Sequence, residues 1–257
     1  MGKSGETFWD TALLRRAVKR WTASARGAST AKLGALRRQR VQARLLRAQL
    51  DRLIQVADAR LAAPVSGQTD IPTPPNSDWA WRPRIWCVPL PVRGMASVEN
   101  RTRVGEEITL FHDCPRSEIA LRQISNPHDH SMAAWAIRLD VFEFGGSFLS
   151  CVLDLPQEAV TGLNRNHILR VSNVLDVDRP VQVFVRLNLR HGPNTEQIVR
   201  EFPFDAKEAS VEFDLAYANV KEARLEKAWV DLIFDNPRMN RITVQDLTFS
   251  RRPRAQL

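Results

Sequence analysis

The chain has 257 residues, of which 44% are apolar, and it carries a formal net charge of +8. Basic residues interrupt every hydrophobic stretch and no apolar segment opens the sequence, which excludes a membrane-spanning helix and a secretory signal. Three cysteines, an odd number without metal-ligand spacing, exclude a disulfide framework. We therefore expect a cytoplasmic protein.

The positive charge is concentrated at the N-terminal end. Residues 1–62 contain 14 Lys and Arg against 4 Asp and Glu, whereas the remainder contains 23 against 25. Because the imbalance is confined to one segment, we expect a basic arm in front of a nearly neutral globular body.

The arm is predicted to form two helices separated near Gly27. Apolar residues between Phe8 and Trp21 follow a helical stripe, with basic residues on the other faces. A clearer period runs from about residue 30 to residue 63, where Leu and Ala recur at gaps of three and four until Pro64 ends the pattern.

Three uses of this arm remain open. Six arginines of the second predicted helix are candidates for binding polyanions: Arg37, Arg38, Arg40, Arg44, Arg47 and Arg52. Without a groove-reading motif, such binding would be non-specific and strongly salt dependent. Tryptophans and leucines among the cations of the first helix favour an anionic membrane surface instead. The third possibility is that the leucine stripe packs on the body or on a second copy.

A linker is predicted at residues 64–77, which contain four prolines and several small polar residues. The expected domains are therefore an arm at 1–63, this linker, and a body at 78–257 that folds alone. Limited proteolysis is expected to cut first between Ala63 and Ser77. The aromatic, proline-rich segment that follows the linker is expected to pack over the edge of the body.

The body reads as β-structure because its hydrophobic period changes to two from about residue 107. The predicted strands are 107–112, 117–124, 133–142, 147–155, 167–176, 180–190, 196–203, 209–215, 228–234 and 241–249. Short helices are predicted at 157–163 and 218–227, and hairpin turns at Gly145-Gly146 and at 191–194. The predicted fold class is mainly β, an antiparallel sandwich of jelly-roll type behind a basic helical arm.

Polar residues that alternate with core residues mark a candidate ligand face. Strand 180–190 places Val183, Val185 and Leu187 on one side and Arg and Asn on the other. Strands 133–142 and 228–234 are predicted to bring more polar residues to the same shallow groove. The predicted ligand-binding residues are Arg138, Asp140, Arg186, Asn188, Arg190, His191, Asn194, Trp229 and Asp231.

Guanidinium, amide, carboxylate and indole groups together suit sugar hydroxyls or an acidic polymer. One alternative is an ordinary outer sheet face held by cross-strand ion pairs, and another is that Trp229 packs beneath a helix. If the groove exists, Arg186→Ala weakens binding by about 1–3 kcal/mol with little change in melting temperature.

No catalytic residue is assigned, because the chain has no nucleophile elbow, P-loop, dinucleotide-binding or kinase motif. Paired carboxylates could in principle cleave glycosides, but strand-borne acids are too common for sequence to select a pair. The candidates are Asp140, Asp154, Glu212, Asp214 and Asp231.

A metal site is also not expected, and neither is a cofactor. The nearest approach to a ligand set is His128-Asp129-His130, with His112 and Asp113 upstream. This run sits in a polar stretch typical of a solvated loop, and two histidines around one aspartate need a third ligand to hold a metal.

Three segments carry a resemblance: FGGSFLSCVLDLP, VRLNLRHGPNTEQIVREF and KAWVDLIFDNPRMNRITVQDLTFSRRPR. They resemble a family of alphaproteobacterial proteins of unknown function, and the similarity covers most of the chain after the linker. It implies a bacterial origin and no particular activity. The closing strands WVDLIF and ITVQDLTFSRR resemble those of galactose-binding-like jelly rolls in carbohydrate-binding modules.

The sequence therefore favours a non-catalytic binding or assembly protein. Its sandwich would bind a carbohydrate or a protein partner, and its arm would act as an anchor. The runner-up is a non-specific binder of polyanions or membrane surfaces that acts through the arm. A glycan-active enzyme is the third hypothesis.

Overall fold

The computed structural model describes residues 8–61, 71–126, 133–203 and 208–254. The chain divides into two compact units, Met1–Val56 and Ala57–Leu257. The predicted boundaries at residues 63 and 77 stay predictions.

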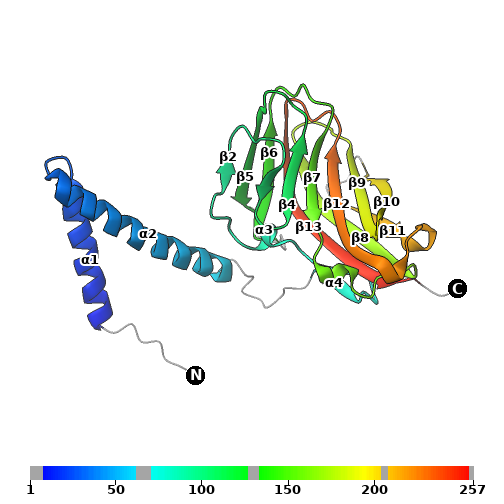
Figure 1. Cartoon of the computed structure of the whole chain (residues 1–257), viewed down its shortest axis with the longest axis horizontal. Helices are drawn as coiled ribbons and strands as arrows, with labels where there is room; N and C mark the ends of the chain where they lie inside the picture. Colours follow the sequence, from blue (N-terminus) through cyan, green and yellow to red (C-terminus); the bar gives the residue numbers. More distant parts are fainter. Residues whose placement is uncertain (1–7, 62–70, 127–132, 204–207, 255–257) are drawn as a thin grey trace. The chain divides into compact units, whose positions relative to one another are not determined.

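Both predicted arm helices are confirmed. They are α1 (Phe8–Arg26) and α2 (Leu33–Leu61), separated by a turn that follows Gly27 (Figure 1). Alanine, leucine, arginine and glutamine, which favour helix, dominate α2. Among the described helices, none has a stretch long and apolar enough to cross a membrane.

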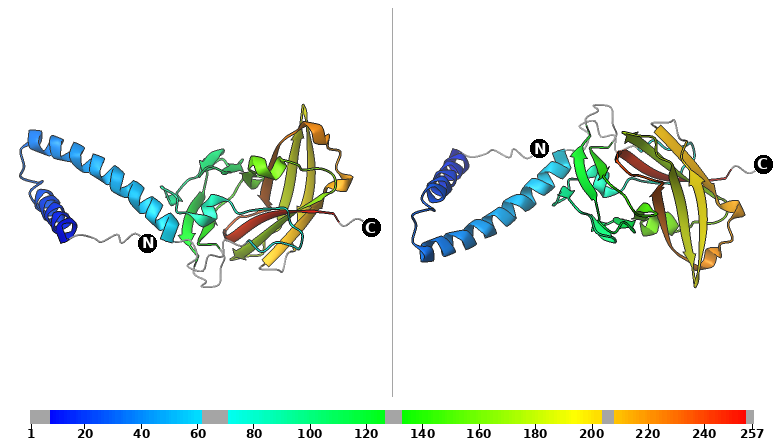
Figure 2. Two further views of the ribbon diagram at one scale, coloured as in Figure 1. Left: turned by 90° about the horizontal axis from the view of Figure 1, so that it is seen from below. Right: turned by 90° about the horizontal axis from the view of Figure 1, so that it is seen from above.

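The second unit is built from two antiparallel sheets that lie face to face (Figures 1 and 2). Within the described residues, sheet A has the strand order β11-β8-β13-β6-β5-β2, and β1 also pairs with β13. Its strands are β1 (Trp79–Trp81), β2 (Gly94–Met95), β5 (Ile119–Ser125), β6 (Trp135–Val141), β8 (His167–Val177), β11 (Glu208–Asp214) and β13 (Asn240–Pro253).

Sheet B has the order β10-β9-β12-β7-β4-β3 within the same described ranges. Its strands are β3 (Thr102–Val104), β4 (Ile108–His112), β7 (Leu149–Asp154), β9 (Val183–His191), β10 (Asn194–Glu201) and β12 (Leu225–Phe234). The chain crosses between the sheets repeatedly, as from β6 to β7, β7 to β8 and β8 to β9. The predicted fold class, a jelly-roll-like sandwich preceded by helices, is confirmed.

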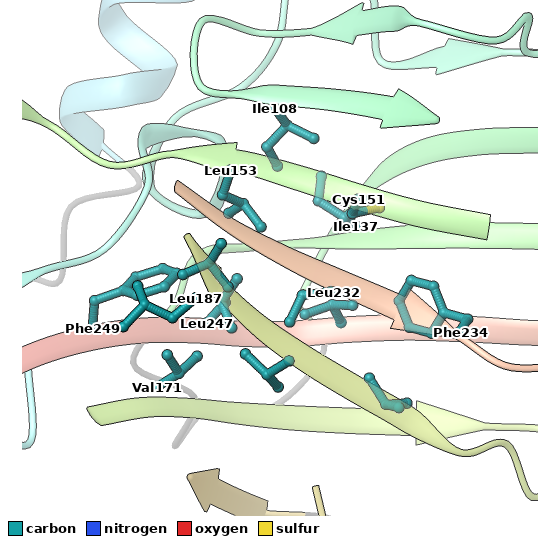
Figure 3. Packing of buried hydrophobic residues seen from close by; sticks show 14 of the residues in the cluster. Ile108, Ile137, Cys151, Leu153, Val171, Leu187, Leu232, Phe234, Leu247 and Phe249 are labelled. Atoms are coloured by element: carbon teal, nitrogen blue, oxygen red, sulfur yellow. The ribbon is translucent and has the colours of Figure 1, made fainter. Parts of the chain in front are cut away.

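The core lies between the sheets, where the inward-facing residues of both layers meet. In β9, Val185 and Leu187 are buried at alternate positions, as the period of two predicts. Figure 3 shows Leu187 and Leu232 of sheet B packing near Leu247 and Phe249 of sheet A. Strand β9 therefore has one face packed in the core and one face directed outward.

The aromatic segment after the linker completes the core. Its strand β1 pairs with β13, and the short helix α3 (Arg84–Cys87) places Trp86 in the interior. The Trp86 indole Nε1 donates to the Val244 carbonyl over 3.0 Å. Buried Gln123 of β5 donates to the carbonyls of Ile85 in α3 and Val88 after it, and it accepts from the Leu90 N–H, so this segment is tied to sheet A.

The ten predicted strands are confirmed as β4 to β13, and α4 (Gln157–Val160) confirms the first short helix. Two predictions are wrong. Residues 218–227 form no α-helix, because only the 3-10 turn η2 (Glu222–Arg224) forms there and β12 begins at Leu225. Gly145-Gly146 is no hairpin, because the strands on either side belong to different sheets.

A candidate ligand-binding face on sheet B

The predicted groove of nine residues does not form, because its members lie on two sheets. Arg138 and Asp140 belong to β6 of sheet A, whereas Arg186, Asn188, Trp229 and Asp231 belong to β9 and β12 of sheet B. The outer faces of a sandwich point away from each other. The prediction of one common groove is therefore wrong, and the sheet B residues form a separate face.

This face is organised by the register of four neighbouring strands. One row across β10, β9, β12 and β7 is Gln197, Asn188, Trp229 and Asp154. The next row is Val199, Arg186, Asp231 and Val152. On β9, β12 and β7 these residues alternate with buried core residues, and on β10 Gln197 and Val199 flank Ile198, which packs against the core. All eight side chains therefore start from the outer side of sheet B. We call these eight residues the sheet B face.

A hydrogen-bonded network holds the centre of this face. Arg186 Nε donates to Asp231 Oδ2 over 2.6 Å, and Asn188 Nδ2 donates to the same oxygen over 3.2 Å. Gln197 Nε2 donates to Asn188 Oδ1 over 2.9 Å. The Asp231 side chain is only 2% exposed, so this carboxylate acts as a buried anchor for its neighbours.

The Arg186 guanidinium is the accessible end of the network. Its side chain is 37% exposed, and its two terminal nitrogens make no hydrogen bond within the described parts of the chain. The other oxygen of Asp231, Oδ1, is buried and also makes no hydrogen bond to the residues described. The pair therefore combines a fixed cation at the surface with a carboxylate beneath it.

An aromatic side chain lies beside this network. Trp229 of β12 is partly exposed, and the short helix α4 packs against the same strand. The Lys227 ammonium lies 5.8 Å from the centre of the indole ring and is ion-paired with Asp154 at 2.6 Å. Arg190 is held further along the strand by Glu226, with Nε and Oε2 3.3 Å apart.

The β9–β10 hairpin confirms the predicted turn at 191–194, but its two candidate residues differ in their exposure to solvent. His191 pairs with Asn194 across Gly192 and Pro193, and Gly192 has a φ of +62°. Asn194 is exposed, whereas His191 is buried at an inward-facing position of β9. The imidazole of His191 is therefore unavailable to a ligand on the sheet B face.

On the opposite face, three arginines surround Asp140. Its carboxylate lies 2.9 Å from Arg122 Nη2, 3.0 Å from Arg138 Nε and 3.3 Å from Arg241 Nε. Burial raises the pKa of Asp140, but the hydrogen bonds and charges of these arginines outweigh burial and leave the pKa below its usual value. The alternative considered from sequence, an outer sheet face held by ion pairs, describes this cluster.

The whole chain, residues 1–257, matches the family described as "Family of unknown function (DUF6478)". The chain belongs to this family. A comparison with curated proteins finds no match. Membership of the DUF6478 family specifies no activity, so function has to be argued from the chain's own residues.

Several solved structures match parts of this DUF6478 chain at low sequence identity. The enzymatically active domain of bacteriophage CBA120 tailspike protein 4 matches at 9% identity and a TM-score of 0.40, over 60% of this chain and 21% of that one. The family 11 carbohydrate-binding module of Clostridium thermocellum, in complex with a mixed-linked tetrasaccharide, matches at 8% identity and a TM-score of 0.38, over 65% and 99%. TmCBM61, in complex with β-1,4-galactotriose, matches at 13% identity and a TM-score of 0.33, over 56% of this chain and 88% of that one.

Other candidate residues of this family member lie outside the sheet B face. His128, Asp129 and His130 fall outside the described residues. His112 is buried, its Nε2 donates to a backbone carbonyl over 2.8 Å, and its Nδ1 accepts from a backbone N–H, so both ring nitrogens are used within the fold. Over the described ranges, no three His, Cys, Asp or Glu residues group as metal ligands.

All five carboxylates considered for glycoside cleavage are ion-paired with Arg or Lys. Asp154 and Asp231 lie on sheet B, whereas Asp140, Glu212 and Asp214 lie on sheet A. The arm arginines Arg37, Arg38, Arg40, Arg44 and Arg47 are exposed on α2, and the side chain of Arg52 falls outside the described residues.

Sequence reasoning missed Gln197 on the sheet B face, and it missed Lys227, which lies beside the Trp229 ring. The polar phase of strand 196–203 was a usable signal for Gln197, since it alternates with Ile198. The sequence did not show which strand would pair with the strand of Gln197, because strand pairing is set by the topology of the whole sheet.

Proposed function

We propose that the protein is a non-catalytic binding protein whose sheet B face takes a carbohydrate or a ligand of similar polarity. The observation that carries this proposal is the Arg186 guanidinium, which is fixed by buried Asp231. Partly exposed Trp229 lies in the adjacent row of the same face. The proposal concerns residues of sheet B alone.

The chemistry of the face suits a polyhydroxylated ligand. The terminal nitrogens of Arg186 can donate to hydroxyl oxygens, and the amide oxygen of exposed Gln197 can accept from hydroxyl protons. The indole of Trp229 offers an apolar plane for the C–H side of a sugar ring. Neighbouring rows of a strand face are about 7 Å apart, so these groups are spaced along a ligand of more than one ring.

The buried anchor also reduces the cost of binding. A free arginine loses side-chain entropy when a ligand orders it, on the order of 1 kcal/mol for a long side chain. Here the 2.6 Å bond to Asp231 already restricts Arg186, and Asn188 and Gln197 extend the same network. The guanidinium is therefore ordered before a ligand arrives.

The test is a glycan array with the full chain, followed by calorimetry on the best ligand. Arg186→Ala alone would leave Asp231 buried without its cation, so the cleaner variant is Arg186→Gln with Asp231→Asn. This double substitution removes both charges, keeps the shape of the side chain at position 231 and shortens the side chain at position 186. We expect it to weaken binding by about 1–3 kcal/mol, the value of a charge-assisted hydrogen bond.

A matched control is Arg138→Gln, which changes an outer-face arginine that is also paired with an aspartate, on the other sheet. It should leave the affinity unchanged. Equal losses in the control and the double variant, or no glycan bound by the wild-type chain, would contradict the proposal. Loss of helix and sheet signals in circular dichroism would identify a variant that fails to fold.

A further inference from the structure

Between Leu13 and Arg26, helix α1 separates apolar and basic residues onto two faces. The first three residues of the helix, Phe8, Trp9 and Asp10, do not follow this division. At 3.6 residues per turn, one face carries Leu13, Leu14, Ala17, Val18, Trp21 and Ala25. The other carries Arg15, Arg16, Lys19, Arg20 and Arg26, with Ala23 among them. We call these the apolar face and the basic face of α1.

The apolar face of α1 is open to solvent. Leu14 is 63% exposed, Leu13 62% and Val18 57%, and these three are among the most exposed large apolar residues described. Trp21 is partly buried, with the Arg20 guanidinium 5.9 Å from its ring. Adjacent exposed apolar side chains on one face are typical of a surface that binds a partner.

The charge of the helix selects the partner. Helix α1 has five basic residues and one acidic residue, Asp10. A second copy would bring one cationic helix against another, and a nucleic acid would neutralise the basic face but leave the apolar face in water. A bilayer with anionic head groups satisfies both faces, because it offers negative charge and apolar depth within one surface.

We propose that α1 binds the surface of anionic lipid bilayers, lying in the interface with its apolar face toward the acyl chains. The long stems of Arg and Lys allow the basic face to reach the head groups while Leu14 and Val18 are buried. Trp21 lies between Ala17 and Leu14 on the apolar face and contributes an indole, a side chain enriched at membrane–water interfaces. This site is independent of the sheet B face.

The experiment uses the full chain and co-sedimentation with vesicles. One set is pure phosphatidylcholine, and the other contains roughly a third phosphatidylserine to supply negative charge. Two variants carry the same change of charge in the same helix: Leu14→Glu on the apolar face and Ala23→Glu on the basic face. Both positions are exposed, so neither substitution disturbs packing.

The wild-type chain is expected to bind only the anionic vesicles. Ala23→Glu should weaken binding about fivefold, the effect of one charge near such a surface. Leu14→Glu should weaken it on the order of a hundredfold, because the burial of a leucine is lost as well. Equal weakening by both variants would mean a purely electrostatic polyanion site and would overturn the proposal.

Two further outcomes would also overturn it. One is an absence of binding to the anionic vesicles. The other is a dimer, detected by sedimentation velocity, that Leu14→Glu dissociates while vesicle binding is unchanged, since the apolar face would then be occupied by a second copy.

Discussion

The ion pair between Arg186 and Asp231 offers a direct test of how the sheet B face is built. Arg186→Ala removes a cation whose side chain is 37% exposed and leaves a carboxylate that is 2% exposed. Asp231 then keeps only the hydrogen bond from Asn188, at 3.2 Å. The reverse change, Asp231→Ala, leaves an arginine that water can still reach.

The two substitutions should therefore have unequal costs. Breaking a buried pair costs about 3–5 kcal/mol, and the partial exposure of Arg186 reduces the expected loss for Arg186→Ala to about 2–3 kcal/mol. Asp231→Ala should cost about 1 kcal/mol, the value of an ordinary hydrogen bond. The double variant should also lose only about 1–2 kcal/mol, since it leaves no unpaired buried charge.

Urea denaturation of the full chain and the three variants measures these losses as differences in the free energy of unfolding. The double-mutant cycle then isolates the coupling between the two side chains, expected at about 1–3 kcal/mol. If Arg186→Ala lies within about 0.5 kcal/mol of wild type, or the single losses simply add, Asp231 is solvated and the network is not the anchor described above.

Three other perturbations test separate parts of the second unit. Gly146→Ala would place Cβ against Asp113 Oδ1 and 2.8 Å from the backbone nitrogen of Cys114, so thermal denaturation should show a loss of about 1–3 kcal/mol in stability. Gly145→Ala, with open space around it, should be neutral. Because the pKa of Asp140 is lowered, its contribution to stability is present above about pH 4 and is lost as pH falls further. The difference in free energy of unfolding between wild type and Asp140→Asn should therefore shrink on acidification. A difference that stays constant with pH contradicts this. Burial raises the pKa of Cys151 to about 12, so its thiol should resist alkylation at pH 8 until urea is added, as peptide mapping can check.

Much of the fold was predictable because the period of two is a local property. In β9, alternating Val and Leu report which side of the strand is buried, and the structure buries that side. Strands β1, β2 and β3 were missed because they span only two or three residues, too short for a period to show. Residues 218–227 contain several helix-favouring residues, but β12 extends back to Leu225 and uses part of that run in sheet pairing.

The candidate site was predictable only in part, for a related reason. Alternation correctly directs Arg186 and Asn188 away from the core, and it does the same for Arg138. It carries no information about which sheet a strand joins. His191 shows a second limit, since its position at a turn suggested exposure while its phase in β9 buries it.

The amino-acid sequence by itself determined the helical arm, the sandwich class and the outward direction of Arg186, because each depends on residues close together in the chain. The tertiary structure alone decided that Asp231 is buried beneath Arg186 and that Asp140 collects arginines from β5, β6 and β13 on the other sheet. These contacts join residues far apart in sequence. They depend on strand order and register, which arise when the two sheets pack and the whole core is formed.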